Sequence, residues 1–464
     1  MKVLTRIAFV LLFVSTLFGA SERKKVEKTF TVEPNQRIVI KNLPSMNVRV
    51  RSWDRNEIKF DLQIEINSSD DDYEKAFVNE FDIVSSSTSS EIVIEAVQPK
   101  HGSWSFWDLF ELKFHYYVEK QIRGEIYLPN SNSLYSDISY SDMDLSGMKG
   151  ELEFEGRSND LLLSNCVNIS KISNQYGNVT ITKSGGDLLL ESRSSTVKIF
   201  EFDGPVNIDA PYSNVELYDV TGSANVSTRS ASVKAERIGG DLKLDAPYCG
   251  LDIDGVKGNV NASDRSGTIK INDAEGLTLD IPYSNLTVTN LEVKNNSKIK
   301  IGSRSGTLSF TDVKGKMDIS DDYSNFTFTN IIGDVKLSSR SGSININGMK
   351  GKLDIQTSYS TIGINKITSD EIIITNRSNP IGITLTNVPK VIDIHNEYGG
   401  VEIHMPKGFA GDVDFTALYG EIDSDFALKV KSEGNTLRAY GSVGSGSGKI
   451  KIYTRSGDIK VKEN

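Results

Sequence analysis

The chain has 464 residues, 38% of them hydrophobic, and a formal net charge of −10 at pH 7. This acidic balance argues against nucleic acid as a partner, since affinity for a phosphate backbone comes from basic side chains. Two cysteines and four scattered histidines are too few for a disulfide scaffold or a metal site, so we expect no cofactor.

The first residues have the order of a secretory signal, in which charges precede an apolar run. Lys2 and Arg6 lie before a run of apolar or small residues from Ile7 to Ala20, which falls short of a membrane span. We expect residues 1–21 to be a signal peptide and the mature protein to be exported, either to the periplasm, the cell surface or the medium. No later stretch is long and apolar enough to predict a transmembrane span.

Residues 22–135 lack the repeat that dominates the rest of the chain, and we expect them to form a β-rich cap over its first open edge. A short helix is predicted over Asp70–Phe81, with Ser69 or Asp70 as its N-cap. Alternating apolar and polar residues predict further strands in this region, namely Arg37–Lys41, Asn47–Arg51, Glu57–Ile66 and Glu91–Val97.

An aromatic insert at residues 101–117 interrupts the capping region and includes Trp104 and Trp107. Two interpretations of the insert are open. It is either an apolar lid over the end of the repeat array or an exposed aromatic patch that binds a partner, a glycan or a lipid surface. Both tryptophans are therefore candidate binding residues.

From residue 136 to residue 464, two short signatures alternate along the chain. One signature begins with tyrosine and the other with arginine, and the spacing is mostly 17 residues from tyrosine to arginine and 19 from arginine to tyrosine. Such an internal repeat is typical of a solenoid. The tyrosines are Tyr140, Tyr176, Tyr212, Tyr248, Tyr283, Tyr323, Tyr359 and Tyr398, and the arginines are Arg157, Arg193, Arg229, Arg265, Arg304, Arg340 and Arg377.

The apolar positions show that the repeating unit has 18 residues and not 36. The first aliphatic residue after successive signatures is Val179, Val197, Val215, Val233, Leu251 and Ile269, in steps of 18. Within a unit, apolar and polar residues alternate with a period of two on either side of a corner. The predicted fold class for residues 136–464 is therefore all-β, a single-stranded parallel β-solenoid with one coil per unit.

Counting this alternation through one corner assigns the two signatures to opposite sides. Tyr212 falls on the inward parity, with Ser194 and Ser230 at the equivalent slot of the neighbouring coils, so we expect the tyrosines to fill the corner. Arg229 falls on the outward parity, and the arginines should form an exposed row with a spacing of about 10 Å. The row consists of Arg157, Arg193, Arg229, Arg265, Arg304, Arg340 and Arg377, all of which are candidate binding residues.

Two roles are open for these arginines. They either lie over neighbouring tyrosines and pair with nearby carboxylates, or bind an extended anionic polymer that carries a repeating charge.

The two cysteines are predicted to stay unpaired. Cys166 and Cys249 lie five coils apart, which corresponds to about 24 Å along the axis, whereas a disulfide needs Cα atoms within about 7 Å. We expect two buried or half-buried free thiols.

Several short motifs resemble the bacterial putative-adhesin β-strand-repeat family of unknown function. They are the turns Gly333-Asp334-Val335 and Arg455-Ser456-Gly457-Asp458-Ile459, the opening Ile38-Val39-Ile40-Lys41-Asn42 with Val48–Asp54, and the close Met405-Pro406-Lys407-Gly408-Phe409. The resemblance extends from about Phe30 to Val461. It implies an exported β-solenoid of the cell envelope, with no catalytic residues to transfer.

We expect a non-enzymatic protein of the cell envelope or cell surface, with an adhesin-like or scaffold role and with partners among envelope polysaccharides and other surface proteins. The alternative is a solenoid that binds glycans or anionic polymers. A polysaccharide-degrading β-helix enzyme is the least favoured class, because the turns are short and no set of carboxylates converges on one face. With both ends of the array capped, we expect a monomer.

Overall fold

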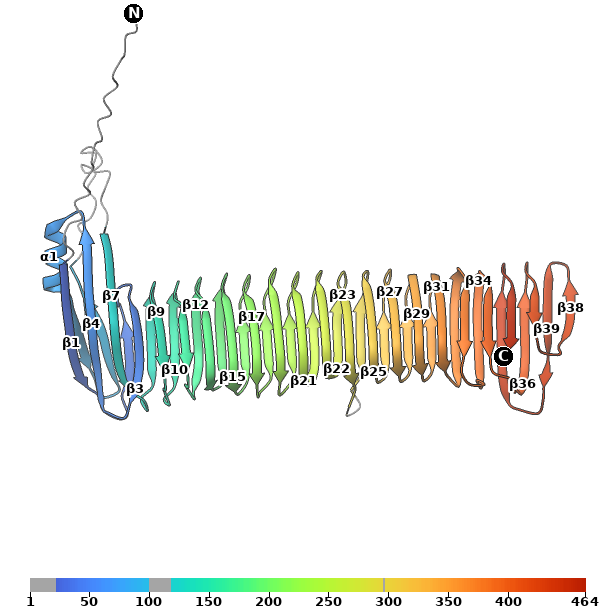
Figure 1. Ribbon diagram of the computed structural model, residues 1–464, viewed down its shortest axis with the longest axis horizontal. Coiled ribbons are helices and arrows are strands. Elements are labelled where there is room, and N and C mark those ends of the chain that lie inside the picture. Colours follow the sequence, from blue (N-terminus) through green and yellow to red (C-terminus); the bar gives the residue numbers. More distant parts are fainter. Residues whose placement is uncertain (1–21, 100–117, 295–296) are drawn as a thin grey trace, which may run out of the picture.

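The computed structural model describes residues 22–99, 118–294 and 297–464. The expected signal peptide and the aromatic insert with Trp104 and Trp107 lie outside the described residues. Strands account for 67% of the structure and helix for 2%, which confirms the all-β prediction. The strands stack into a long rod, with the N-terminal strands at one end (Figure 1).

Each coil of the rod contributes two strands, one to each of two parallel ladders. One coil contains β16 (Val206–Asp209) and β17 (Asn214–Val220), and the next contains β18 (Ala224–Ser227) and β19 (Ser232–Ile238). β16 pairs with β18 and β17 pairs with β19, both in parallel and 18 residues apart in register. This register confirms one coil per unit.

The same two ladders continue through most of the chain. β21 (Gly250–Ser263) and β22 (Thr268–Ile281) are long enough to take part in both. The first ladder also contains β8 (Leu134–Ser139), β10 (Leu152–Arg157), β12 (Ile169–Gln175), β14 (Leu188–Arg193), β20 (Leu242–Asp245), β24 (Ile299–Ser303), β26 (Met317–Ser320), β28 (Val335–Ser338), β30 (Leu353–Gln356), β32 (Glu371–Ser378) and β34 (Val391–Tyr398). The second also contains β9 (Asp142–Ser146), β11 (Leu161–Ser164), β13 (Val179–Gly185), β15 (Thr196–Asp203), β23 (Asn285–Glu292), β25 (Thr307–Lys314), β27 (Asn325–Ile332), β29 (Ser341–Lys350), β31 (Tyr359–Thr368), β33 (Ile381–Leu385) and β35 (Val401–Met405).

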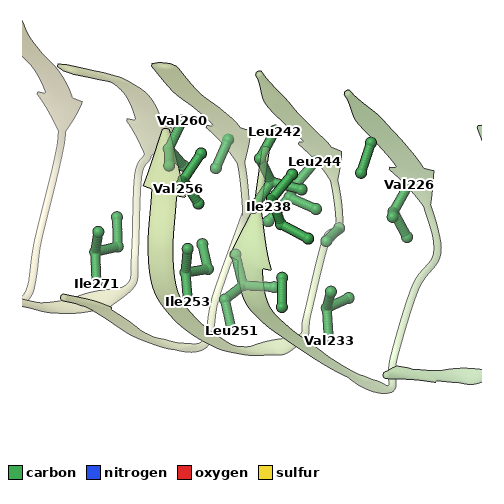
Figure 2. Close-up of a cluster of buried hydrophobic side chains, with 14 of the residues drawn as sticks. Val226, Val233, Ile238, Leu242, Leu244, Leu251, Ile253, Val256, Val260 and Ile271 are labelled. Carbon is green, nitrogen blue, oxygen red and sulfur yellow. The ribbon is translucent and has the colours of Figure 1, made fainter. Parts of the chain in front are cut away.

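The core is a continuous stack of aliphatic side chains between the two ladders. Figure 2 shows Val233, Leu251, Ile253 and Ile271 from the second ladder beside Leu244 from the first. All five are buried. Because each coil supplies only a few inward side chains, a coil gains most of its stability from the coils stacked on it.

The N-terminal end is a twisted antiparallel sheet that leads into the rod. β1 (Glu22–Thr31) pairs with β4 (Glu57–Ser68), and β4 pairs with β7 (Val118–Pro129). β5 (Asp82–Ser87) pairs with β6 (Glu91–Val97). β2 (Arg37–Lys41) and β3 (Asn47–Trp53) stack in parallel on β8 and β9, so parallel stacking already includes two strands of the expected cap. The division of the chain at residue 135 stays a prediction.

The expected helix of this region is confirmed as α1 (Asp71–Glu80), which Asp70 caps by accepting hydrogen bonds from the backbone N–H groups of Asp72 and Tyr73. Within the described residues, no helix is long and apolar enough to cross a membrane.

At the C-terminal end the strands stack out of sequence order. β40 (Gly448–Thr454) lies between β34 and β36 (Gly411–Ala417), and β41 (Ile459–Glu463) lies between β35 and β37 (Ile422–Ser424). β39 (Thr436–Val443) and β38 (Lys429–Glu433) then close this end with antiparallel pairing. The chain thus builds the outermost coil first and returns to fill the level beneath it (Figure 1).

The two cysteines are free and buried, as expected from their separation. Cys166 and Cys249 are 0% and 1% exposed. Burial raises the pKa of both thiols, because it disfavours the charged thiolate.

The raised thiol pKa values predict a loss of stability at alkaline pH. The stability is present below the ordinary cysteine pKa of about 8.5 and is lost as the pH rises towards the higher folded-state values. Between about pH 7 and about pH 10, we expect the free energy of urea unfolding to fall more for the wild type than for a Cys166→Ala, Cys249→Ala double variant. An equal fall in both proteins would contradict the burial of the thiols.

Candidate functional site

One corner of every coil joins the first ladder to the second, and the tyrosine and arginine signatures lie there. The corner between β16 and β17 turns at Tyr212, which has a left-handed backbone with φ of 61°. One coil further, Ser230 occupies the same slot with φ of 54°. The same conformation occurs at Tyr140, Tyr176 and Tyr248.

The left-handed residue overturns one prediction, that the tyrosines fill the corner. Tyr212 is 46% exposed, and the side chain that points inward is that of Ser213, which is fully buried. The prediction was wrong because counting by twos assumes extended backbone throughout, whereas the chain turns at this corner, at Tyr212 through a left-handed residue, and the turn shifts the parity. The arginines point outward, as expected: Arg193, Arg229 and Arg265 are all exposed.

The inside of the corner is polar, because the turn leaves backbone groups that the strand ladders cannot pair. The hydroxyl of Thr228 donates hydrogen bonds to the carbonyls of Ala210 at 2.8 Å and Ser213 at 3.1 Å. Further along, the buried carboxylate of Asp264 accepts from the hydroxyl of Ser284 at 2.6 Å and from the backbone N–H of Cys249 at 3.3 Å. These small polar residues hydrogen-bond the backbone groups of the turn on its inner side. The outer surface of the turn is therefore open to other side chains.

The outer surface of the corner carries one continuous row of alternating tyrosines and arginines. Strand register places each tyrosine in the slot equivalent to that of Tyr212, and each arginine one slot earlier on the neighbouring coil. Tyr212, for example, donates its backbone N–H to the carbonyl of Arg229 at 3.2 Å. The backbone in this slot is left-handed at the first four tyrosines and not at Tyr283 or the tyrosines after it. We call this row the Tyr/Arg ladder; in spatial order it runs Tyr140, Arg157, Tyr176, Arg193, Tyr212, Arg229, Tyr248, Arg265, Tyr283, Arg304, Tyr323, Arg340, Tyr359, Arg377, Tyr398, Arg455 and Tyr419.

The C-terminal end of the ladder is the part that the sequence signature alone does not reveal. Arg455 lies 57 residues after Tyr398 in the chain, yet its guanidinium donates a hydrogen bond to the Tyr398 hydroxyl at 2.9 Å. On its other side, the carbonyl of Arg455 accepts a hydrogen bond from the backbone N–H of Tyr419 at 2.8 Å. The alternation therefore holds in space where it fails in sequence. The Arg-Ser-Gly motif at Arg455 is visible in the sequence. The level at which this motif lies in the stack cannot be read from the sequence.

Several arginines lie over tyrosine rings, as one of the two predicted roles requires. The guanidinium carbon is 5.3 Å from the ring centre for Arg157 and Tyr176, and 5.8 Å for Arg193 and Tyr212. The corresponding distances are 5.7 Å for Arg304 over Tyr283, 5.9 Å for Arg340 over Tyr323 and 5.6 Å for Arg455 over Tyr398.

The electrostatic surroundings of the arginines differ between the two halves of the ladder. In the C-terminal half, Arg304 lies 3.7 Å from a carboxylate oxygen of Asp322, and Arg377 lies 3.5 Å from one of Glu397. In the N-terminal half the intervening slots hold uncharged residues, namely Gln175, Pro211, Pro247 and Pro282. Across the described parts of the chain, neither Arg229 nor Arg265 has a carboxylate within 4.0 Å or a tyrosine ring beneath its guanidinium.

The two flanks of the ladder also differ in charge. On the side of the first ladder, exposed carboxylates recur at Glu191, Asp209, Asp245 and Asp280. The other side, which we call the polar flank, is an uncharged column of Asn178, Thr196, Asn214, Ser232, Gly250 and Thr268.

Two open hollows of about 480 and 450 Å³ follow the polar flank and share Glu216 and Ser232 in their lining. Asn178 and Asn214 are held in place, because each side-chain oxygen accepts a backbone hydrogen bond from the next coil at 3.1 Å. The amide nitrogen of Asn178 donates to the Asp160 carboxylate at 3.1 Å, whereas that of Asn214 has no hydrogen-bond partner among the described residues and remains available as a donor.

The residues described give no support for a metal centre. Among them, no group of three or more His, Cys, Asp or Glu side chains is placed to hold a metal ion. The candidate residues Trp104 and Trp107 lie outside the described residues, and their role stays a prediction.

Comparison with known proteins supports the fold family. Residues 247–462 match the family described as Toastrack DUF4097, which confirms the resemblance to a β-strand-repeat family over that part of the chain. No curated protein matches the chain. A crystal structure described as a putative cell adhesion protein from Clostridium sporogenes is similar at 12% identity, over 95% of this chain and 100% of that chain, with a TM-score of 0.13. A score this low adds nothing to the fold, which rests on the strand pairing above.

The exposure of the tyrosines predicts that their rings contribute little to stability. Replacing Tyr212 by Ala should lower the free energy of unfolding by at most about 1 kcal/mol, since it removes mainly the contact with Arg193. Replacing the fully buried Phe202 of the adjacent strand by Ala should cost about 3–5 kcal/mol. Urea unfolding measures both. Equal losses would show that the Tyr212 ring is part of the core after all.

Proposed function

We propose that this protein is a non-enzymatic binding solenoid of the cell envelope or cell surface, with an adhesin-like role, and that the Tyr/Arg ladder is its contact surface. The observation that carries this proposal is the position of Arg455. The chain leaves sequence order at its C-terminal end, and the arginine that fills the out-of-order level still lies between Tyr398 and Tyr419. A fold needs stacked strands there, but it does not need alternation on the outside of the corner.

The backbone at the tyrosine slots supports the same proposal. A left-handed residue costs least when it is Gly, Asn or Asp, whereas a bulky side chain there is strained. Tyr140, Tyr176, Tyr212 and Tyr248 nevertheless adopt this conformation with their rings exposed. Since neither packing nor backbone geometry favours tyrosine at these slots, the exposed rings themselves supply the reason for its presence.

The composition of the ladder is that of a contact surface. Tyrosine and arginine are enriched where proteins bind partners, because both present a large flat surface with a polar end. Contacts between neighbouring rings and guanidinium groups, as at Arg157 and Tyr176, hold the side chains in place before a partner arrives.

The expected signal peptide supports a position of this surface outside the cytoplasm, where we propose envelope polysaccharides and other surface proteins as its partners. Since we expect no set of convergent carboxylates for hydrolysis at these short corners, the activity we propose is binding by a monomer.

Removing the charge of three ladder arginines tests the proposal. We expect an Arg193→Gln, Arg229→Gln, Arg265→Gln variant to melt close to the wild-type temperature, because all three side chains are exposed. Its retention on the cell-envelope fraction of the source organism should fall by about tenfold or more in a co-sedimentation assay, since charge-assisted contacts are lost.

A matched control separates the ladder from net charge. Lys243, Lys257 and Lys300 are exposed and lie outside the ladder. Changing these three lysines to Gln removes the same charge and should leave retention within about twofold of wild type. Equal losses in the two variants, or no loss in either, would contradict the ladder as the contact surface.

A further inference from the structure

We infer that the segment of the ladder from Tyr176 to Tyr283 binds a single chain of an acidic linear polysaccharide, with its carboxylates on Arg229 and Arg265 and its sugar rings against the tyrosines between them. This inference rests on the proposed function and adds the chemical class of the partner. It is carried by the charge, the spacing and the two flanks of this segment.

Two arginines of this segment have no carboxylate or tyrosine ring as a partner among the described residues. Most other ladder arginines face a tyrosine ring or a carboxylate, as Arg304 and Arg377 do. Arg229 and Arg265 have neither among the described residues, and the slots beside them hold Pro211, Pro247 and Pro282. A planar guanidinium without a partner is a site for bidentate hydrogen bonding to a carboxylate.

The spacing fits a chain of rings that carries its charges at intervals. Arg229 and Arg265 lie two coils apart, or about 9.6 Å, with the exposed ring of Tyr248 on the coil between them. An extended disaccharide of β-linked sugars has nearly this length. The apolar faces of sugar rings pack against aromatic rings, and acidic sugars carry a carboxylate on each ring. A polyanion without rings would gain nothing from the tyrosines.

The flanks determine on which side such a chain lies. The carboxylates of Asp209, Asp245 and Asp280 would repel it on one side. The polar flank on the other side offers amides and hydroxyls, the groups that hydrogen-bond sugar hydroxyls, and the hollows beside it leave room for a ring. The charged side chains that line these hollows are three lysines (Lys198, Lys234 and Lys270) and two carboxylates (Glu216 and Asp252), so the balance there is positive.

Gly250 widens the polar flank in the middle of the segment. It lies on the coil of Tyr248, and a Cβ atom built there meets no atom within 4 Å. Its backbone is not left-handed. A large side chain at Gly250 would therefore occupy the space of the ligand without disturbing the fold.

Titration calorimetry with defined oligosaccharides tests this inference on the mature protein. The acidic probe is a β-1,4-linked oligomannuronate, its neutral counterpart is a β-1,4-linked mannan oligosaccharide of equal length, and polyglutamate is the anion without sugar rings. We expect the wild type to bind oligomannuronate at least about tenfold more tightly than either of the other two, in a salt-sensitive way.

Two variants locate the binding. Arg229→Gln, Arg265→Gln and, separately, Gly250→Trp should each weaken oligomannuronate binding by about tenfold or more. A Lys243→Gln, Lys300→Gln control should stay within about twofold of wild type. Thermal melts of all variants show whether they are folded.

The outcomes distinguish this inference from the proposed function. Equal affinity for polyglutamate or for the neutral mannan would overturn the acidic polysaccharide, and so would full binding by Gly250→Trp. If no oligosaccharide binds while retention on envelopes still depends on the ladder arginines, the ladder stands as the contact surface and the polysaccharide is wrong. If neither depends on them, both fail.

Discussion

The parallel hydrogen-bond ladders between successive coils fix the vertical distance between equivalent side chains at about 4.8 Å. Every outward position of this protein therefore belongs to a column whose members cannot move apart. Two tyrosines or two arginines on adjacent coils would crowd or repel one another at that distance. Alternation with small or rigid residues doubles the interval, which halves the repulsion between like charges and leaves room for each ring. This constraint sets the interval at which tyrosines and arginines can recur once they are present, but it does not itself require either residue type.

The same constraint explains why so much of the fold was predictable from the sequence. Steps of 18 residues between Val179 and Ile269 follow directly from stacking in register, and the pairing of β17 with β19 and of β19 with β21 reproduces them. The free state of Cys166 and Cys249 follows from the same register.

Two features escaped prediction, each for a physical reason. Tyr212 faces outward because its left-handed backbone shifts the parity at the corner, and periodicity in the sequence does not report the sign of φ. The position of Arg455 depends on the return of β40 beneath β36, which is a long-range choice of stacking level. The local sequence pattern shows that a segment forms a coil, but it does not show at which level of the stack that coil lies.

In each corner, the residues on the inner side stabilise the turn, and the residues on the outer side form the proposed contact surface. On the inside, Thr228 and Asp264 hydrogen-bond backbone groups of the turn, so the corner does not depend on what projects outward. On the outside, the ladder is free to carry side chains chosen for contact with a partner. Binding residues on a repetitive scaffold are spread along its length, and a long partner with a matching period gains affinity from many weak contacts.

The spacing and continuity of the ladder can be measured directly by pulsed electron spin resonance between nitroxide labels at its serine slots, in a background that lacks both native cysteines. Ser230 and Ser305 lie four levels apart and Ser230 and Ser456 ten levels apart. At ~4.8 Å per level, the two label pairs should report separations of about 19 Å and about 48 Å. A coil of 36 residues would give about half the first distance, and a Ser456 label that lay beyond the level of Tyr419 would lengthen the second; either result would contradict the ladder described above.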